Sequence, residues 1–196
     1  MDFSKLFRDF IGNSDIDKYI DLVRKNSKGK IWLIGGFVYK NIVGIIKEKK
    51  QIVNDLDFLV ENPSDIMNIP EKYWKMGITS YGNPFFIYSE KREKISIDLN
   101  YISSFHSIVS RNLPPIIESF LSGTPLTIQS IAYDLDECKI IGETGISAIT
   151  KKLIEINNIE EARYETERRK ITFEEYLKEK AIPLGLNWRL PTSNSH

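Results

Sequence analysis

The stretch Ile31-Trp32-Leu33-Ile34-Gly35-Gly36, followed one predicted helix later by Asn54-Asp55-Leu56-Asp57-Phe58, decides the fold that we predict for this chain. A short apolar run that ends in two glycines is typical of a buried strand leading into a helix. Because side chains alternate across a strand, Asp55 and Asp57 should project from one face while their apolar neighbours point into a core. Two carboxylates on one face can hold a divalent cation, so the pair indicates metal-assisted phosphoryl transfer.

The composition of the chain limits the classes of fold and function that are possible. The chain has 196 residues, 41% hydrophobic and 28% charged, which suits one compact domain with a short appendage. Its single cysteine, Cys138, excludes an internal disulfide and a cysteine-rich zinc cluster, and we interpret it as a small buried residue rather than a nucleophile. No apolar run approaches the roughly 18 residues of a membrane span, so we expect a soluble, cytoplasmic protein. Lysine and arginine (27) balance aspartate and glutamate (27), so net charge gives no argument for nucleic acid.

Apolar periodicity and turn residues predict an α/β (α+β) fold, a small mixed β-sheet with helices packed against it. We expect helices at 15–26, 37–50, 114–122, 146–153 and 160–180, and strands at 31–34, 52–60, 85–88, 95–101, 126–133 and 139–141. Ser14 and Asp17 resemble a capping box for the first helix. Pro63 predicts a loop at 61–64, and the charged residues 89–94 predict a hairpin turn.

These elements define three regions of the chain. We expect a main domain at 1–156, a helical C-terminal extension at 157–190 and a disordered tail at 191–196.

The glycine pair Gly35-Gly36 can bring backbone close to a phosphate, because no side chain intervenes and a helix N-terminus offers free N–H groups. Taken alone, the glycine pair favours an ordinary tight turn. Asp98 supplies a third carboxylate on a strand whose other face is apolar. Three acids can hold two magnesium ions, roughly 3.5 to 4 Å apart, that activate a hydroxyl and stabilise a leaving group. The alternative for Asp98 is a solvated strand face.

In this order the residues resemble the head domain of the polymerase-beta-type nucleotidyltransferase superfamily, of the CCA-adding enzyme and bacterial poly(A) polymerase type. The family's Gly-Gly-x-x-Arg-Asp, Asp-x-Asp-Phe and Thr-Ile-Asn-Ala-Leu-Ala-Tyr-Asp motifs correspond to residues 35–40, 55–58 and 127–134, and a later glycine-containing segment corresponds to 141–156. The resemblance therefore covers about residues 31 to 156.

The resemblance implies a role for each matching residue. Asp55 and Asp57 would be metal ligands, Asp98 the third carboxylate that also activates the nucleophile, and Gly35 and Gly36 the cradle for a triphosphate. It also implies two Mg²⁺ ions as cofactors and a nucleoside triphosphate such as ATP as a substrate.

This chain departs from the family pattern at several positions. Tyr39-Lys40 stands where the family has Arg-Asp, so Lys40 supplies only a point charge toward the nucleotide. Gln129 replaces an asparagine. The chain is also too short for the neck, body and tail with which those enzymes select nucleotides and hold transfer RNA, so CCA addition does not carry over.

We therefore predict transfer of a nucleoside monophosphate from a triphosphate to a hydroxyl acceptor, with release of pyrophosphate. The acceptor is an RNA 3′ end such as that of a transfer RNA, a small molecule, or a protein side chain, and no membrane is involved. The alternative is a catalytically silent member of the fold that binds a nucleotide or a partner protein.

Other candidates have simpler interpretations. A second acid-x-acid pair, Asp134 and Asp136, reads as a hairpin turn. His106 and His196 have no further ligand at a metal-binding spacing. A basic cluster interleaved with glutamates favours a solvated helix over an RNA-binding surface. It consists of Arg163, Arg168, Arg169 and Lys170.

Overall fold

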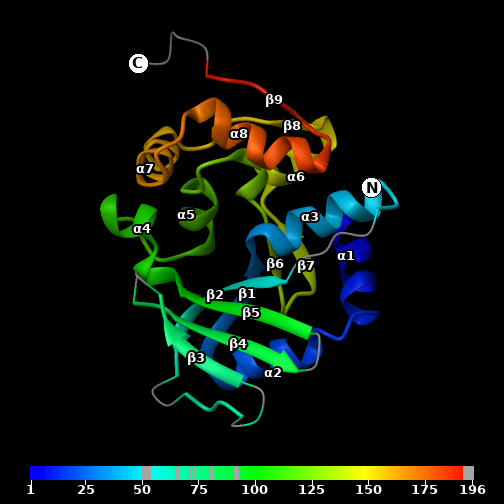
Figure 1. Cartoon of the computed structure of the whole chain (residues 1–196), viewed down its shortest axis with the longest axis vertical. Helices are drawn as coiled ribbons and strands as arrows, with labels where there is room; N and C mark the ends of the chain where they lie inside the picture. The colour runs from blue at the N-terminus through cyan, green and yellow to red at the C-terminus, as the bar shows by residue number, and fades with distance from the viewer. Residues whose placement is uncertain are drawn as a thin grey trace.

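A seven-stranded sheet forms the centre of the molecule (Figure 1). The structure is a computed structural model that describes residues 1–49, 54–64, 67–70, 72, 74–79, 82–90 and 93–191. The sheet has the order β3-β4-β5-β2-β1-β6-β7. Its strands are β1 (Ser27–Ile34), β2 (Asp55–Pro63), β3 (Trp74–Ile78), β4 (Pro84–Glu90), β5 (Glu93–Tyr101), β6 (Ala132–Asp134) and β7 (Lys139–Ile141). β2 and β5 pair in parallel and the other neighbours are antiparallel, which confirms the predicted mixed sheet.

Helices surround the sheet and a small two-stranded sheet lies near the C-terminus. The α-helices are α1 (Phe3–Gly12), α2 (Asp17–Lys25), α3 (Gly35–Ile46), α4 (His106–Ser110), α5 (Ile117–Ser122), α6 (Glu143–Lys151), α7 (Ile159–Arg169) and α8 (Phe173–Ala181). Short 3₁₀ turns are η1 (Ile102–Ser104), η2 (Thr127–Gln129) and η3 (Ile182–Leu184), and β8 (Leu153–Ile154) pairs in parallel with β9 (Asn187–Trp188). Within the described residues, no helix has the length and apolar character needed to cross a bilayer.

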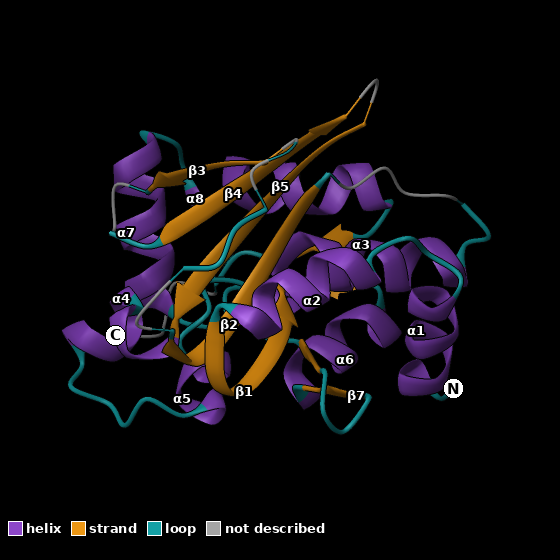
Figure 2. Ribbon diagram, turned by 90° about the horizontal axis from the view of Figure 1, so that it is seen from below, coloured by secondary structure: helices purple, strands orange, loops and turns teal. Residues whose placement is uncertain are grey.

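The central strands are buried on both faces. Leu33 and Phe58 belong to the larger core, to which α1, α2 and α3 contribute, whereas Ile34 and Leu59 belong to a smaller core with α4 and α5. Figure 2 shows α1 and α2 on one side of the sheet and α4 and α5 on the other. The strand predicted from its continuous apolar run is thus confirmed, because a strand covered on both faces needs no polar alternation.

Several predicted boundaries are wrong, each for a local reason. Ser14 does not cap the second helix: its hydroxyl donates to the carbonyl of Ile11 at the end of α1, a helix we did not predict, and α2 begins with no side-chain cap. Residues 61–63 belong to β2 rather than to a loop, and the carboxylate of Glu61 accepts from the backbone N–H of Lys30. The edge strand β3 was also not predicted.

Later in the chain, the predicted strand at 126–133 is largely the turn η2, since the Gln129 side chain accepts from the backbone N–H of Leu126 and closes it. The predicted helix at 160–180 is two helices, because Lys170 adopts a left-handed φ of 54°. Cys138 is exposed, so its prediction as a buried residue is wrong. Parts of four predicted elements lie outside the described residues, namely 50 of a helix, 52–53 of a strand, 91–92 of a turn and 192–196 of the tail.

Candidate functional site

Two neighbouring parallel strands bring the three predicted aspartates to one face of the sheet. In the β2–β5 ladder, Asp57 stands directly opposite Asp98, and Asp55 stands opposite Ser96. Paired residues in a ladder point to the same face, and residues two apart on one strand do so too. Asp55, Asp57 and Asp98 therefore share a face, and Asp57 is also opposite Ile34, the residue before the glycine pair.

The three carboxylates influence one another's ionisation. Burial, followed by the negative charges of Asp98 and Asp55, raises the pKa of Asp57 to about 7. Burial and the charge of Asp55 also raise the pKa of Asp98. Two lysines, Lys40 and Lys180, act in the opposite direction on the pKa of Asp57. The face thus carries an excess of negative charge that a bound cation would relieve.

The side chains present have the chemistry that magnesium prefers, but they do not form a complete coordination site. Among the residues that the structure describes, no three acidic, histidine or cysteine side chains gather closely enough to hold a metal ion as they stand. Carboxylate oxygens are nevertheless the ligands that Mg²⁺ prefers, and it often completes its shell with substrate phosphates. Binding would require the three aspartates to draw together around the cation.

The start of α3 lies against this acidic face. Gly35 has a φ of +68°, and a Cβ atom at this position would lie 2.3 Å from Oδ2 of Asp57. A Cβ on Gly36 would lie 3.3 Å from Cε of Lys40, one turn further along the helix. Only glycine therefore brings this helix N-terminus so close to the carboxylate, and its backbone N–H groups are where an anion can approach.

The positions that depart from the family pattern have different environments. Tyr39 is 3% exposed and packs in the larger core, and burial, followed by the charges of Tyr176 and Asp57, raises its pKa. It therefore brings no positive charge to the site, whereas Lys40 is partly exposed and acts on Asp57. The side-chain oxygen of Gln129 accepts hydrogen bonds from the backbone N–H of Leu126 and, at 3.3 Å, from the Tyr176 hydroxyl. Its role is therefore structural.

A cavity of about 180 Å³ opens further along the same face of β5. It includes Asn100, which lies two residues beyond Asp98 and so points the same way. The His106 ring stacks on Tyr164 with centroids 3.8 Å apart, and its Nδ1 lies 3.0 Å from a carboxylate oxygen of Glu161. Glu161 is only 6% exposed. A flat aromatic stack beside a buried carboxylate suits a planar heterocycle with hydrogen-bond donors.

The sequence gives no local signal for this cavity or for the basic residue Lys180. His106 and Glu161 are far apart in the chain, and only the packing of α7 against α4 reveals that they touch. Lys180 lies in a run of alternating glutamates and lysines that carries no motif. A search for histidines and acids at local spacings could not find the contact between His106 and Glu161.

The remaining predicted candidates are structural. The carboxylate of Asp134 accepts from the backbone N–H groups of Asp136 and Glu137, at 2.9 Å each, and from Nε1 of Trp32 at 3.1 Å, so the predicted turn is confirmed. In the basic cluster, Arg168 and Arg169 pair with nearby glutamates and Arg163 is exposed, as expected of a solvated helix.

Comparisons with known proteins agree with this architecture. No protein-family model matches the chain, and no curated protein matches its sequence. The fold is similar to that of a tRNA-processing enzyme in its apo form 2, with a TM-score of 0.51, 14% identity, and coverage of 82% of this chain and 41% of that one.

Two further solved structures are similar at lower scores. A tRNA-processing enzyme with CTP has a TM-score of 0.49 and 14% identity, covering 82% of this chain and 40% of its own. The Bacillus stearothermophilus CCA-adding enzyme in complex with CTP has a TM-score of 0.47 and 17% identity, covering 81% and 36%. The fold of this chain is therefore similar to that of the tRNA-processing enzyme in its apo form 2. The chain spans about two fifths of the length of each of the two tRNA-processing enzymes.

Proposed function

We propose that this chain is a metal-dependent nucleotidyltransferase, which moves a nucleoside monophosphate from a nucleoside triphosphate to a hydroxyl group. One observation carries the proposal: Asp57 faces Asp98 across two parallel strands and lies against the glycine that begins α3. A polyphosphate bound at that helix N-terminus would lie next to the carboxylates, which is the arrangement that phosphoryl transfer needs.

In the proposed reaction, the oxygen of the acceptor hydroxyl attacks the α-phosphorus. The bond from that phosphorus to its bridging oxygen breaks, and pyrophosphate leaves with the electron pair. We assign Asp98 to accept the hydroxyl proton on its carboxylate and Lys40 to attract the departing phosphates. Two magnesium ions held by Asp55, Asp57 and Asp98 would offset the charge that develops on the phosphates.

We assign the nucleoside end of the substrate to the cavity beside Asn100. The His106–Tyr164 stack offers an aromatic surface to a base, and the Glu161 carboxylate accepts hydrogen bonds from amino or imino groups. Among the acceptors, an RNA 3′ end is the first to test, because the neighbour of highest TM-score among those reported is a tRNA-processing enzyme.

The test measures pyrophosphate release with Mg²⁺, each of the four triphosphates and a panel of RNA and small-molecule acceptors. Turnover should vanish in Asp55→Asn, since that variant removes one carboxylate without changing the side-chain shape. Asp136→Asn is the matched control, because Asp136 ends the other acid-x-acid pair, is exposed, and lies in a turn away from the site. Unchanged turnover in Asp55→Asn would overturn the proposal.

A catalytically silent nucleotide-binding module is the second candidate. The burial of Tyr39 favours it, because the family's guanidinium is missing and no charge replaces it at that position. Mg²⁺-dependent binding of a triphosphate without turnover on the whole acceptor panel would select this candidate.

A further inference from the structure

We propose that Phe85, on β4, is an acceptor-binding residue whose ring stacks on the base of a terminal nucleoside, the hydroxyl of which lies at Asp98. The inference rests on the proposed function, which gives Asp98 the proton of the acceptor hydroxyl, and it deepens that function by assigning a binding surface to the acceptor. The ligand class is the 3′ end of a single-stranded nucleic acid, with its base, its ribose and the preceding phosphodiester.

The strand register places Phe85 directly beside the acids. Phe85 of β4 pairs with Asp98 of β5, which in turn pairs with Asp57 of β2. On its other side, Phe85 pairs with Gly77 of the edge strand β3. Residues that pair across a ladder point to the same face of the sheet, with Cβ atoms roughly 5 Å apart. The four residues therefore form one row across one face, and Phe85 is the neighbour of Asp98 in that row.

The ring of Phe85 lies over the edge strand because Gly77 has no side chain. A Cβ atom on Gly77 would lie 2.4 Å from Cζ and 2.6 Å from Cε1 of the ring. The ring tip thus occupies the space that a larger residue at position 77 would need. Phe85 extends along the row away from Asp98, so the ring does not cover the carboxylate.

Neither hydrophobic core includes Phe85. In the part of the chain that the structure describes, the cores take in Tyr88 of β4 but neither Phe85 nor Ile87, which are both partly exposed. The opposite face of β3 and β4 is covered, because Tyr19 of α2 packs against Trp74 and Tyr88. The face that carries the acids therefore keeps a partly exposed aromatic ring, which is the surface on which a base stacks.

Charged neighbours favour a nucleic-acid strand over an apolar peptide as the occupant. Lys75 of β3 pairs with Ile87, and Lys94 of β5 is four residues before Asp98, so both lysines share the face of Phe85. Both are exposed. An ammonium group attracts a phosphodiester, whereas an aromatic ring stacks on any base. A base on Phe85 would thus place its sugar beside Asp98 and its phosphodiester toward these lysines.

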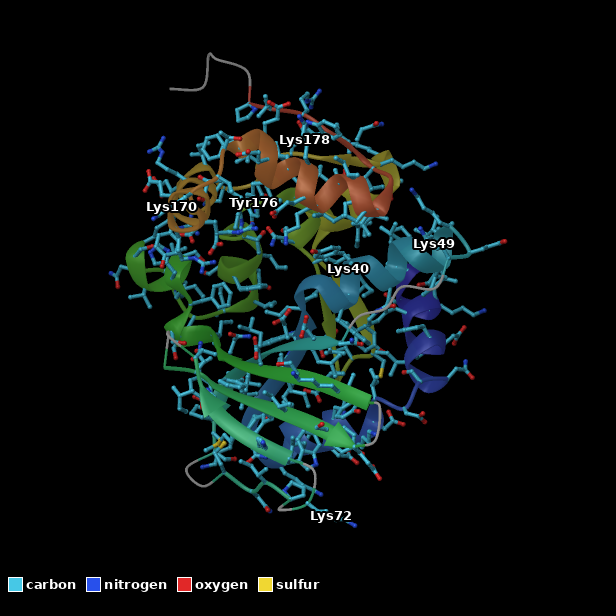
Figure 3. The ribbon with its side chains drawn as sticks, viewed as in Figure 1. Lys40, Lys49, Lys72, Lys170, Tyr176 and Lys178 are labelled. Carbon is cyan, nitrogen blue, oxygen red and sulfur yellow. The ribbon has the colours of Figure 1, made fainter. Side chains whose placement is uncertain are left out.

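The acceptor and the triphosphate would reach the acids from different sides. The sheet order places the two acid-bearing strands, β5 and β2, between β4, which carries Phe85, and β1, which leads into α3. In the view of Figure 3, Lys40 of α3 lies between Tyr176 of α8 and the strands β5 and β4. Approach from opposite sides suits a displacement in which the attacking and leaving oxygens are in line.

The experiment is a fluorescence titration of the full chain with a short single-stranded RNA that ends in a 3′ hydroxyl, with Mg²⁺ and without a triphosphate. Phe85→Leu keeps an apolar cover over Gly77 but removes the flat ring, and it should weaken binding about tenfold. Phe85→Tyr should restore most of the affinity. Phe10→Leu is the matched control and should leave the affinity unchanged, because Phe10 is also a partly exposed ring but packs against the larger core.

A second probe tests the stacking contact itself. It is the same RNA with a 3′-terminal nucleotide that lacks its base. The unchanged protein should bind this abasic strand about tenfold more weakly, and Phe85→Leu should cause no further loss on it, since the base and the ring form one interaction.

Equal affinities of Phe85→Leu and the unchanged protein for the intact strand would overturn the proposal, as would a lack of binding to that strand. So would equal losses on the intact and abasic strands, which would reflect a disturbed sheet edge rather than a lost stack. The titration does not depend on turnover. Unchanged turnover in Asp55→Asn would refute the proposed function, whereas these binding results would refute only the role of Phe85.

Discussion

Replacing Gly35 by alanine separates backbone strain from a steric effect on the site. The residue has a φ of +68°, and a left-handed conformation costs an alanine about 1 to 2 kcal/mol. The new Cβ would lie 2.3 Å from Oδ2 of Asp57, whereas ordinary contact begins at 3.4 Å, so the carboxylate has to move by about 1 Å. A displacement of that size at a reacting centre is expected to reduce turnover about 100-fold.

Gly82→Ala is the matched control. Gly82 has a φ of +80°, and a Cβ there would meet nothing within 4 Å. Both variants should lose a similar 1 to 2 kcal/mol or so in urea unfolding from the backbone term, with a further loss in Gly35→Ala. Only Gly35→Ala should lose pyrophosphate release and the rise in melting temperature that Mg²⁺ and a triphosphate produce. If Gly35→Ala kept both pyrophosphate release and the rise in melting temperature, Asp57 would have no functional role beside the start of α3.

Three further predictions concern the acids and the stability of the fold. The pKa of Asp57 is raised to about 7, so the folded metal-free protein still binds a proton at a pH where the unfolded chain has released it. The contribution of this protonated carboxyl to the free energy of unfolding is therefore present at low pH and is lost as the pH rises through about 7. Urea unfolding in chelator should therefore show a smaller decrease in stability between about pH 5 and pH 8 in Asp57→Asn, and an unchanged decrease would contradict the raised pKa. Asp134→Ala should lower the free energy of unfolding by about 1 to 3 kcal/mol, because the indole N–H of Trp32 is left without its acceptor, and tripolyphosphate binding measured on the folded variant should be unchanged. Thr172→Ala should cost about 1 kcal/mol by removing the cap of α8, in which Thr172 and Glu175 bond reciprocally; denaturation curves that superimpose on those of the unchanged protein would disprove this capping role.

The centre of the fold could be predicted from the sequence because its signals are local. An apolar run ending in glycines, and acids alternating with apolar residues, place β1, α3 and β2 without knowledge of the rest. The hairpin of β4 and β5 follows from the same alternation, so the face on which Asp98 lies was also predictable. Its register opposite Asp57 was not, since the pairing of two parallel strands depends on the segments between them.

What could not be predicted depends on contacts between distant segments. Ser14 fits a capping pattern, but the end of α1 offers its hydroxyl a closer acceptor. Gln129 stands in a strand-like run, yet its side chain closes a turn and receives the Tyr176 hydroxyl. The effect of Lys180 on the pKa of Asp57 arises only because the fold places α8 near α3. Local patterns thus predict where the acids lie, while tertiary packing decides which cations and aromatic rings face them.

Diffraction from crystals grown with Mn²⁺ and a non-hydrolysable triphosphate analogue tests the central claim most directly. Anomalous peaks are expected among the carboxylates of Asp55, Asp57 and Asp98, with the phosphates running from the start of α3 toward Lys40. Peaks elsewhere, or a triphosphate bound with no cation at these three aspartates, would contradict it.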